Sequence, residues 1–392
     1  MLRGWQKSIK VWEGVRQYLK DCASDQSLTF FSEGRPYHSF LHPVISAMQH
    51  ILSKPVFYIT CDEDDPYLTE PPNNVKPYFI GNGPAMIYLF TNTKTGTMVM
   101  TMPDLNKFHV KRSVHPVHYV YIFHSIVSTH MVYREGAFDH FDSILCVGPH
   151  QKLEIRAWEK LRGLPEKNLL NHGYGPLDAL LNANTLLPQQ TTEGTANRTN
   201  ILIAPSWGSQ GILETVGQEL ISILMAANLN VTVRPHPRTR ELSPRTLLEL
   251  TQKFGSDQRF ALDLDTTDFD SLITADLMIS DWSGAAMELS FGLGKPVLFI
   301  DVPPKVNNLS WEDISLAPLE VAYRSQVGRI LSPSDIHQAP ERIIELLSNC
   351  KDFADNIRAL RKTHVYNVGT SGRDGARIIY GISQNPLKTQ VH

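Results

Sequence analysis

The chain has 392 residues, of which 42% are hydrophobic and 20% are charged, and its formal net charge is -3. This length favours two domains with ample apolar cores, and the near-zero charge gives no field that would attract nucleic acid. No run of eighteen apolar residues occurs and the N-terminus lacks the apolar stretch of a secretory signal, so a soluble cytoplasmic protein is expected. The four cysteines form no CxxC pair, which is typical of reduced thiols in a cytosolic protein.

Residues 1–22 have the pattern of an amphipathic helix with an apolar face and a basic face. The apolar face holds Trp5, Ile9, Trp12, Val15 and Leu19, and the basic side chains are Arg3, Lys7, Lys10, Arg16 and Lys20. Two roles fit this pattern. We favour a helix docked on the following domain; the alternative is peripheral contact with the inner face of an anionic plasma membrane.

Residues 28–183 alternate short apolar runs with helix-like segments, which is typical of a Rossmann-like domain. The expected strands are Leu28–Phe31, Pro55–Thr60, Thr97–Met102, His118–Phe123, Ser143–Val147 and Asn168–His172. Polar residues follow two of these strands, namely Glu33 and Gly34 after the first and His124 after the fourth. His130 and Arg134 lie four residues apart, which predicts that they share one helical face.

A polar, Thr/Asn-rich segment at 184–199 reads as a linker to a second domain, 200–369, with the same rhythm. The last segment, 370–392, is expected to return to the first domain. The sequence therefore predicts an α/β protein with two Rossmann-like domains facing a cleft, the GT-B architecture, preceded by an amphipathic helix at 1–27.

Residues 275–301 form a strand–helix–strand pattern, with apolar runs at Leu277–Ile279 and Pro296–Ile300 around a helix at Gly284–Gly292. Asp281 follows the first strand and Ser283 and Gly284 begin the helix. Ligands bind at this edge of an open α/β sheet, and free N–H groups at a helix N-terminus favour phosphate. The alternative is a plain structural unit in which Ser283 only caps the helix.

Two further segments carry groups suited to phosphate. In PSWGSQG, Ser206 opens a glycine-containing turn directly after an expected strand. In RPHPRTR, the prolines favour an extended backbone, so Arg234, His236 and Arg238 are expected to project together. Such a cationic group suits a diphosphate or the charge of a departing phosphate. The alternative is a surface turn with arbitrary basic residues.

In combination, RPHPR, SDWSGAAMELSFGLGKPVLFID, PKVNN, YNVGTSGRDGA, SEGRPY and VHYVYIFHS resemble the CDP-glycerol glycerophosphotransferase family of teichoic-acid and capsule polymer enzymes. The resemblance covers most of residues 28–380. It implies a metal-independent transferase without a cofactor. Such an enzyme would move glycerol phosphate, or a related polyol phosphate, from a CDP-alditol donor to a hydroxyl of a polyol-phosphate, glycan or lipid-linked acceptor, releasing CMP.

The resemblance also implies roles for individual residues. His236 matches the family histidine that helps bind the phosphates, and the turn at 281–284 matches the nucleotide-diphosphate site. The family base is a histidine followed by Gly-Thr-Pro. His124 is followed instead by Ser125 and Ile126, so His130 remains a competitor. A histidine with a pKa near neutrality suits the removal of a proton from an attacking hydroxyl.

Other residues are candidates for the same site. Arg234, Arg238 and Ser206 are expected on the donor phosphates and Glu33 and Gly34 on the acceptor side. Glu288 is expected to bind a ribose hydroxyl, to form a salt bridge or to face solvent. Asn307 and Asn308 are expected either to contact the nucleotide base or to form a turn. Arg134 is expected beside His130, on the acceptor or ribose side.

No metal site is expected, because the fifteen histidines include no HExxH motif and no cysteine lies near enough to complete a zinc set. No P-loop and no GxSxG motif occurs. Two alternatives to the transferase remain: a glycosyltransferase or sugar-nucleotide epimerase using a UDP- or CMP-sugar, and a non-catalytic nucleotide-binding scaffold.

Overall fold

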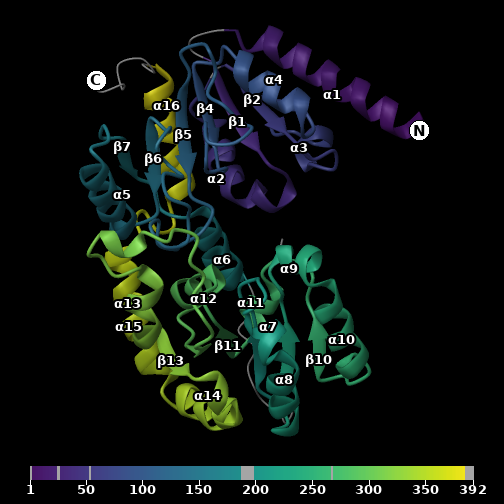
Figure 1. Ribbon diagram of the computed structural model, residues 1–392, viewed down its shortest axis with the longest axis vertical. Helices are drawn as coiled ribbons and strands as arrows, with labels where there is room; N and C mark the ends of the chain where they lie inside the picture. Colours follow the sequence, from purple (N-terminus) through teal and green to yellow (C-terminus); the bar gives the residue numbers. More distant parts are fainter. Residues whose placement is uncertain (1, 24–26, 53, 187–197, 266–267, 385–392) are drawn as a thin grey trace.

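The computed structural model of the chain describes residues 2–23, 27–52, 54–186, 198–265 and 268–384. Two parallel sheets, one above the other in Figure 1, define two α/β halves. The first sheet has the strand order β3-β2-β1-β4-β5-β6-β7 and the second has the order β10-β9-β8-β11-β12-β13. The predicted architecture of two Rossmann-like domains is therefore confirmed.

The strands of the first sheet are β1 (Leu28–Ser32), β2 (Val56–Thr60), β3 (Val75–Phe79), β4 (Thr97–Met100), β5 (His118–Ile122), β6 (Ser143–Cys146) and β7 (Asn168–Asn171). Those of the second are β8 (Asn200–Ile203), β9 (Asn230–Val233), β10 (Phe260–Leu262), β11 (Leu277–Ser280), β12 (Val297–Ile300) and β13 (Gly328–Leu331). Every residue of β1, β2, β4, β5, β6, β11 and β12 is buried, because helices cover both faces of a parallel sheet.

The helices of the first half and its neighbours in sequence are α1 (Leu2–Asp21), α2 (His38–Met48), α3 (Pro66–Thr69), α4 (Pro84–Asn92), α5 (Pro149–Arg162) and α6 (Gly175–Leu186). Those that follow are α7 (Ile212–Thr215), α8 (Gly217–Ala226), α9 (Pro237–Leu242), α10 (Pro244–Phe254), α11 (Asp270–Thr274), α12 (Gly284–Leu293), α13 (Leu319–Val327), α14 (Ala339–Ser348), α15 (Cys350–His364) and α16 (Ser371–Gln384).

Helix α1 packs along the edge of the first half, against β3 and α4. Its buried face is rotated from the predicted one: Val11, Val15 and Tyr18 are buried, whereas Ile9 is 56% exposed. Gly14 permits this docking, because a Cβ there would come within 2.1 Å of the Phe79 carbonyl oxygen. Among the described residues, no helix is long and apolar enough to cross a membrane.

The last helix, α16, packs against α2 and α6 of the first half (Figure 1). On the way to it, the Tyr366 N–H donates to the Val147 carbonyl at 2.8 Å, and the Ser371 N–H donates to Asp178 Oδ2 at 2.8 Å. The chain thus passes between the halves twice. The first passage, the expected linker at 184–199, lies mostly outside the described residues, as does the C-terminal tail after Gln384.

Candidate functional site between the two halves

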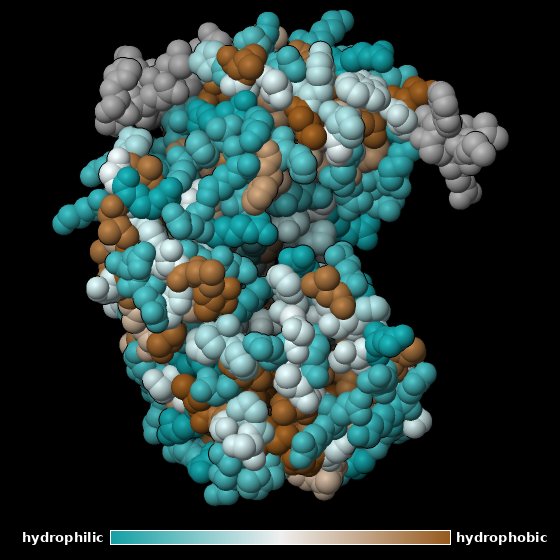
Figure 2. Space-filling model, viewed as in Figure 1, coloured by the Kyte–Doolittle hydropathy of each residue, from teal (hydrophilic) through white to brown (hydrophobic). Residues whose placement is uncertain are grey.

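A hollow separates the two halves on one side of the molecule (Figure 2). The candidate residues of the first half follow β1, β4 and β5, and those of the second half follow β8, β9, β11 and β12. Charges act across the gap: burial raises the pKa of Tyr37, which lies before α2, and among the smaller effects Arg238 of α9 lowers it and Glu241 of α9 raises it. Parallel strands place loop residues at one edge of each sheet, so two such edges form one polar site.

His124 follows β5 and supplies a ring nitrogen to this site. Its Nδ1 lies 3.1 Å from the Thr101 carbonyl oxygen, which can only accept, so Nδ1 carries the hydrogen and Nε2 has the free lone pair. The rings of Tyr37, Phe40 and Tyr133 surround the imidazole at 5.7–6.1 Å. Burial lowers the pKa of His124 to about 4, and the ring is neutral at pH 7.

His236 stands directly before α9 and is its N-cap residue. Its Nδ1 accepts a hydrogen bond from the Arg238 N–H at 3.1 Å, so the hydrogen is on Nε2. Burial first, and then the nearby cations Lys305 and Arg238, lower the pKa of His236 to about 4. The neutral ring presents an N–H donor.

The two histidines therefore have complementary tautomers. His124 offers a hydrogen-bond acceptor and His236 offers a donor. They lie close enough that protonation of His124 would disfavour protonation of His236, which adds to the lowered pKa of His236. With a base on one side of the cleft and an N–H donor on the other, one group can take a proton from an attacking hydroxyl while the other stabilises negative charge on the group that is attacked.

The basic segment after β9 differs from the predicted geometry because α9 begins at Pro237 and the extended conformation ends at His236. Arg234 turns inward, where Nη1 contacts Asp263 at 2.9 Å and the Ser271 hydroxyl at 2.8 Å. The expectation that Arg234 projects beside His236 and Arg238 is thus wrong. The contacts of Arg234 lie within the second half, whereas the side chain of Arg238 is exposed.

Two residues that the sequence did not single out join His236. Lys305, in the loop after β12, places Nζ 3.4 Å from the ring centroid of Trp207, which follows β8. The guanidinium carbon of Arg238 lies 4.0 Å from the same centroid. The sequence around these two residues offered only weak signals, namely the prolines before Lys305 in PPKVNN and the tryptophan itself in PSWGSQG. Neither signal indicates that Lys305 lies close to Trp207.

Asp281 and Ser206 form the floor of this part of the site. The Ser206 N–H donates to Asp281 Oδ1 at 2.7 Å, which connects the loops after β8 and β11. Asp281 is 1% exposed, and burial raises its pKa. The aromatic ring that follows it is fixed as well, because Trp282 Nε1 donates to the Val302 carbonyl at 2.8 Å and Arg324 stacks on the indole at 4.0 Å.

The start of α12 lies against the loop that carries His124. Ser283 caps the helix through its hydroxyl, which accepts from the Ala285 N–H at 3.3 Å, as the structural alternative predicted. Gly284 has no room for a side chain, because a Cβ would lie 2.4 Å from Ser125 Oγ. At the other end Gly294, in the left-handed conformation, caps the helix, whereas Gly292 lies within it.

Glu288 lies one turn further along α12, against the first half. Its Oε1 accepts from the Tyr174 hydroxyl at 2.5 Å, and that hydroxyl also lies 3.4 Å from the His124 carbonyl oxygen. Burial raises the pKa of Glu288, while Tyr174 and Arg234 act in the opposite direction. One carboxylate oxygen is therefore committed to a contact between the halves, and the ribose role stays a prediction.

His130, Asn307 and Asn308 hold the halves together and lie apart from His124. The loop after β5 contains no helix, so the predicted helical face shared by His130 and Arg134 is wrong. His130 is 1% exposed and its Nε2 donates to the Leu316 carbonyl at 3.1 Å.

The two asparagines reach the same segment from the second half. Asn308 Nδ2 donates to the His130 carbonyl at 2.9 Å, and Asn307 Nδ2 donates to the Val132 carbonyl at 2.6 Å. Arg134 is paired with Asp104 at 3.1 Å on the surface. The contacts of His130 and the two asparagines fix the orientation of the halves.

Glu33 and Gly34, which the sequence analysis assigned to the acceptor, directly follow β1. Gly34 has φ 148°, and the Ser32 hydroxyl accepts from its N–H at 3.2 Å. Glu33 Oε2 is buried without a hydrogen-bond partner among the described residues, and burial raises the pKa of Glu33 from 4.5 to about 7. A buried carboxyl group with an unused oxygen at a sheet edge is a suitable contact for an acceptor hydroxyl.

The raised pKa of Glu33 predicts a pH-dependent stability effect. The folded protein binds more protons than the unfolded chain between pH 4.5 and 7, so the group lowers stability as pH rises through this window. We expect Glu33→Gln to raise the free energy of unfolding by about 1–3 kcal/mol at pH 8. The gain should vanish at pH 4. Urea unfolding at both values checks this, with the exposed Glu70→Gln as control; a gain that is equal at both values would refute the assignment.

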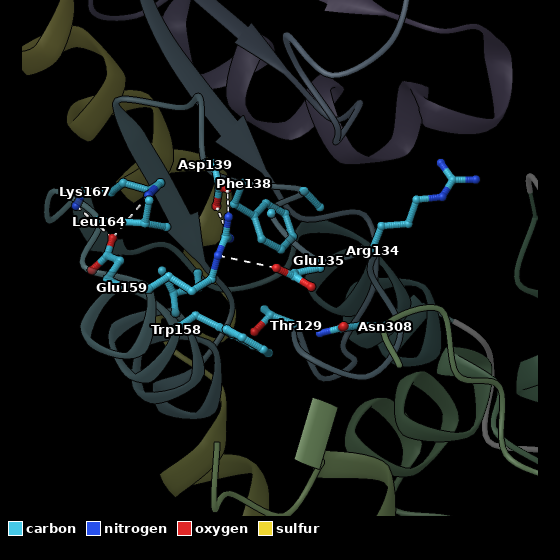
Figure 3. Close-up of a pocket in the computed structure, with 14 residues that line it drawn as sticks. Thr129, Arg134, Glu135, Phe138, Asp139, Trp158, Glu159, Leu164, Lys167 and Asn308 are labelled. Atoms are coloured by element: carbon cyan, nitrogen blue, oxygen red, sulfur yellow. Dashed lines mark hydrogen bonds and ion pairs between the residues drawn. The ribbon is translucent and has the colours of Figure 1, made fainter. Parts of the chain in front are cut away.

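A separate small pocket lies between the loop 129–139, α5 and Asn308 (Figure 3). Its charged groups are already paired: Arg162 contacts Asp139 at 2.8 Å and Glu135 at 3.5 Å, and Lys167 contacts Glu159 at 3.5 Å. Neither of the two facing histidines lines it. It therefore offers little free charge to a ligand, and the cleft remains the candidate site.

Within the described residues, no group of three or more His, Cys, Asp and Glu side chains could hold a metal ion. Helix α2 carries two histidines, His38 and His42, which stack one turn apart with their ring centroids 5.1 Å from each other. The Tyr67 hydroxyl lies 2.6 Å from His42 Nδ1. This pair was not among the candidates that the sequence suggested.

Solved structures with the same fold support the two-domain architecture. Over 98% of this chain and 97% of the other, the chain is similar to the wall teichoic acid polymerase TagF, in a histidine variant soaked with CDPG (14% identity, TM-score 0.63). The Methanocaldococcus jannaschii UDP-GlcNAc 2-epimerase, in complex with UDP-GlcNAc and UDP, is also similar (14% identity, TM-score 0.58). That match covers 92% of this chain and 100% of the epimerase chain. The S. aureus MnaA–UDP structure matches 93% of this chain and 97% of its own (14% identity, TM-score 0.58).

No protein-family model and no curated protein matches the sequence. At these identities the similarity establishes the fold. This chain has the GT-B fold.

Proposed function

We propose that the protein is a transferase that moves glycerol phosphate, or a related polyol phosphate, from a CDP-alditol to an acceptor hydroxyl. The acceptor is a polyol-phosphate, glycan or lipid-linked chain of a cell-surface polymer such as teichoic acid or capsule. The observation that carries this proposal is the pair of neutral histidines with complementary tautomers, facing each other beside the cations Arg238 and Lys305.

In the proposed reaction, the acceptor oxygen attacks the phosphorus that bears the polyol. Its proton passes to His124 Nε2, whose lone pair is free because Nδ1–H is held by the Thr101 carbonyl. The bond from phosphorus to the CMP oxygen breaks, and CMP leaves with the electron pair. The products are a phosphodiester and CMP, with one proton on His124.

The charge that develops on the phosphoryl oxygens and on CMP is stabilised from the second half. His236 donates through Nε2–H, and Arg238 supplies positive charge. Phosphoryl transfer needs positioning and electrostatic stabilisation more than covalent participation by the protein. Asp281, Ser283 and Gly284 shape the donor side through the connected loops, and Glu33 contacts the acceptor.

The GT-B fold is shared with TagF and with UDP-GlcNAc 2-epimerases, so the fold suits a nucleotide-linked donor of either kind, and the choice of the CDP-alditol class rests on the sequence resemblance. The sequence motifs around His236 and Asp281 point to the same class. Helix α1 is docked on the first half, where Lys7 and Lys10 lie 6.0 and 5.7 Å from the Phe79 ring and Lys7 pairs with Glu63 at 2.9 Å, so contact of this helix with a membrane-bound acceptor stays a prediction.

A donor screen tests the proposal. The protein is incubated with CDP-glycerol, CDP-ribitol, a CMP-sugar or UDP-GlcNAc, each with a glycerol phosphate oligomer as acceptor, and released nucleotide is measured. Release of CMP from a CDP-alditol is the expected result. Turnover of UDP-GlcNAc alone would favour the epimerase or glycosyltransferase alternative, and binding without any turnover would favour the scaffold.

A further inference from the structure

We infer that Lys305 and Arg238, held over the indole of Trp207, bind the phosphates of a nucleoside diphosphate ligand, and that Lys305 takes up a proton on binding. The inference deepens the proposed function, on which it rests for the location of the donor. It concerns the diphosphate and is independent of the polyol.

Three loops bring these groups together from distant parts of the sequence. Trp207 follows β8, Arg238 lies in the first turn of α9 after β9, and Lys305 lies in the loop after β12. Both cationic groups lie within 4.0 Å of the centroid of the same ring. An aromatic face stabilises a nearby cation without neutralising its charge, so both groups remain able to bind an anion.

The arrangement contrasts with that of Arg234, only four residues before Arg238. Arg234 has a carboxylate partner at 2.9 Å, whereas neither Arg238 nor Lys305 forms an ion pair with any described residue. Two like charges on one indole repel each other at close range. A bound anion with two negative groups would remove that repulsion, and a diphosphate provides them.

The charged groups that face Lys305 come from two other segments of the second half. Arg238 and His236 lie on the β9 side and Asp281 follows β11. Burial, then Arg238, lowers the pKa of Lys305 from 10.5 to about 7, and Asp281 acts in the opposite direction. Lys305 is therefore largely neutral at pH 8 in the free protein. A diphosphate beside it favours the protonated form, so binding draws a proton from solution and weakens as pH rises above 7.

The experiment is isothermal titration calorimetry of CDP into the full chain at pH 8, in two buffers of different ionisation enthalpy. We expect an uptake of roughly one proton per site at pH 8 and almost none at pH 6, where Lys305 is already protonated. Lys305→Met should weaken CDP binding about 10–100-fold, because it removes a charge-assisted hydrogen bond. It should also abolish the proton uptake.

Lys305→Arg separates charge from titration. Arginine stays protonated, so this variant should keep CDP affinity within a few-fold while losing the proton uptake. Lys253→Met is the matched control, because Lys253 also lies over an aromatic ring, Phe254 at 5.1 Å, on the exposed helix α10. It should behave like the wild type.

Two results overturn the inference: unchanged CDP affinity in Lys305→Met, or proton uptake that persists in it. Inorganic pyrophosphate as a competitor of CDP tests the phosphate contacts without a nucleoside. If CDP and pyrophosphate depend on Lys305 but no CDP-alditol is turned over, the inference stands and the proposed transfer is wrong. If CDP-glycerol is turned over and Lys305→Met keeps full activity and CDP affinity, the transfer stands and the inference is wrong.

Discussion

Substitution of His124 by asparagine is expected to lower the rate of CMP release from CDP-glycerol by about 10²–10⁴-fold, the range for loss of a general base. In the wild type, His124 Nδ1–H donates to the Thr101 carbonyl at 3.1 Å. The asparagine amide can donate to the same carbonyl and so replaces this hydrogen bond. It has no lone pair at the position of Nε2. The rate should therefore fall while the fold and the affinity for the donor are retained.

The measurement is kcat and KM for CDP-glycerol, with calorimetric binding of the donor and circular dichroism on the same preparation. His140→Asn serves as the control, because that histidine lies in the loop before β6, outside the facing pair. Activity within threefold of the wild type in His124→Asn would exclude His124 as the base.

Substitution of His236 by asparagine should lower kcat/KM about 10²–10³-fold, the typical cost of removing one donor from a developing negative charge. Asparagine is a good N-cap residue, so its side-chain oxygen can accept from the Arg238 N–H as Nδ1 does at 3.1 Å. The donor at Nε2 is lost. This variant thus removes the proposed phosphate contact and keeps the start of α9.

His236→Ala provides the comparison, since it removes both the donor and the cap. It should be as inactive as His236→Asn but less stable, by about 0.5–2 kcal/mol. Thermal or urea unfolding distinguishes the two variants. If His236→Asn kept near-normal activity while His236→Ala lost it, the role of His236 would be structural.

Most of the fold follows from local sequence because buried parallel strands are short apolar runs, as in β5 and β11, where every residue is buried. The two edge strands that the sequence did not indicate are different. β3 contains Pro77 and has only two buried residues, and β13 begins with Gly328 and has two exposed residues. An edge strand needs fewer apolar side chains and tolerates proline, so its signal is weak.

The position of the candidate site was predictable for a similar reason. Residues that directly follow parallel strands share one edge of the sheet, which brings His124, His236 and Asp281 to the cleft. The side-chain partners were not predictable from spacing. Arg234 faces Asp263, twenty-nine residues away, and Lys305 meets Trp207 across ninety-eight residues. Such contacts depend on how separate loops pack.

The sequence left the roles of the buried residues between the halves open for a physical reason. A histidine in a polar loop fits either a catalytic role or a structural one, and only burial distinguishes them. His130 is 1% exposed, and the backbone N–H of Ser128 nearby donates to Glu320 Oε1 at 2.9 Å. Burial raises the pKa of Glu320 to about 7. This part of the loop therefore connects the two halves, and His124 remains the histidine of this loop that is the candidate base.

The central claim is transfer of a polyol phosphate from a CDP-alditol, and ³¹P NMR of the reaction products tests it most directly. CDP-glycerol is incubated with the protein and a glycerol phosphate oligomer. We expect the two diphosphate resonances to disappear while the resonance of CMP and a new phosphodiester resonance grow in equal amounts. Unchanged CDP-glycerol, in a preparation that converts UDP-GlcNAc, would contradict it.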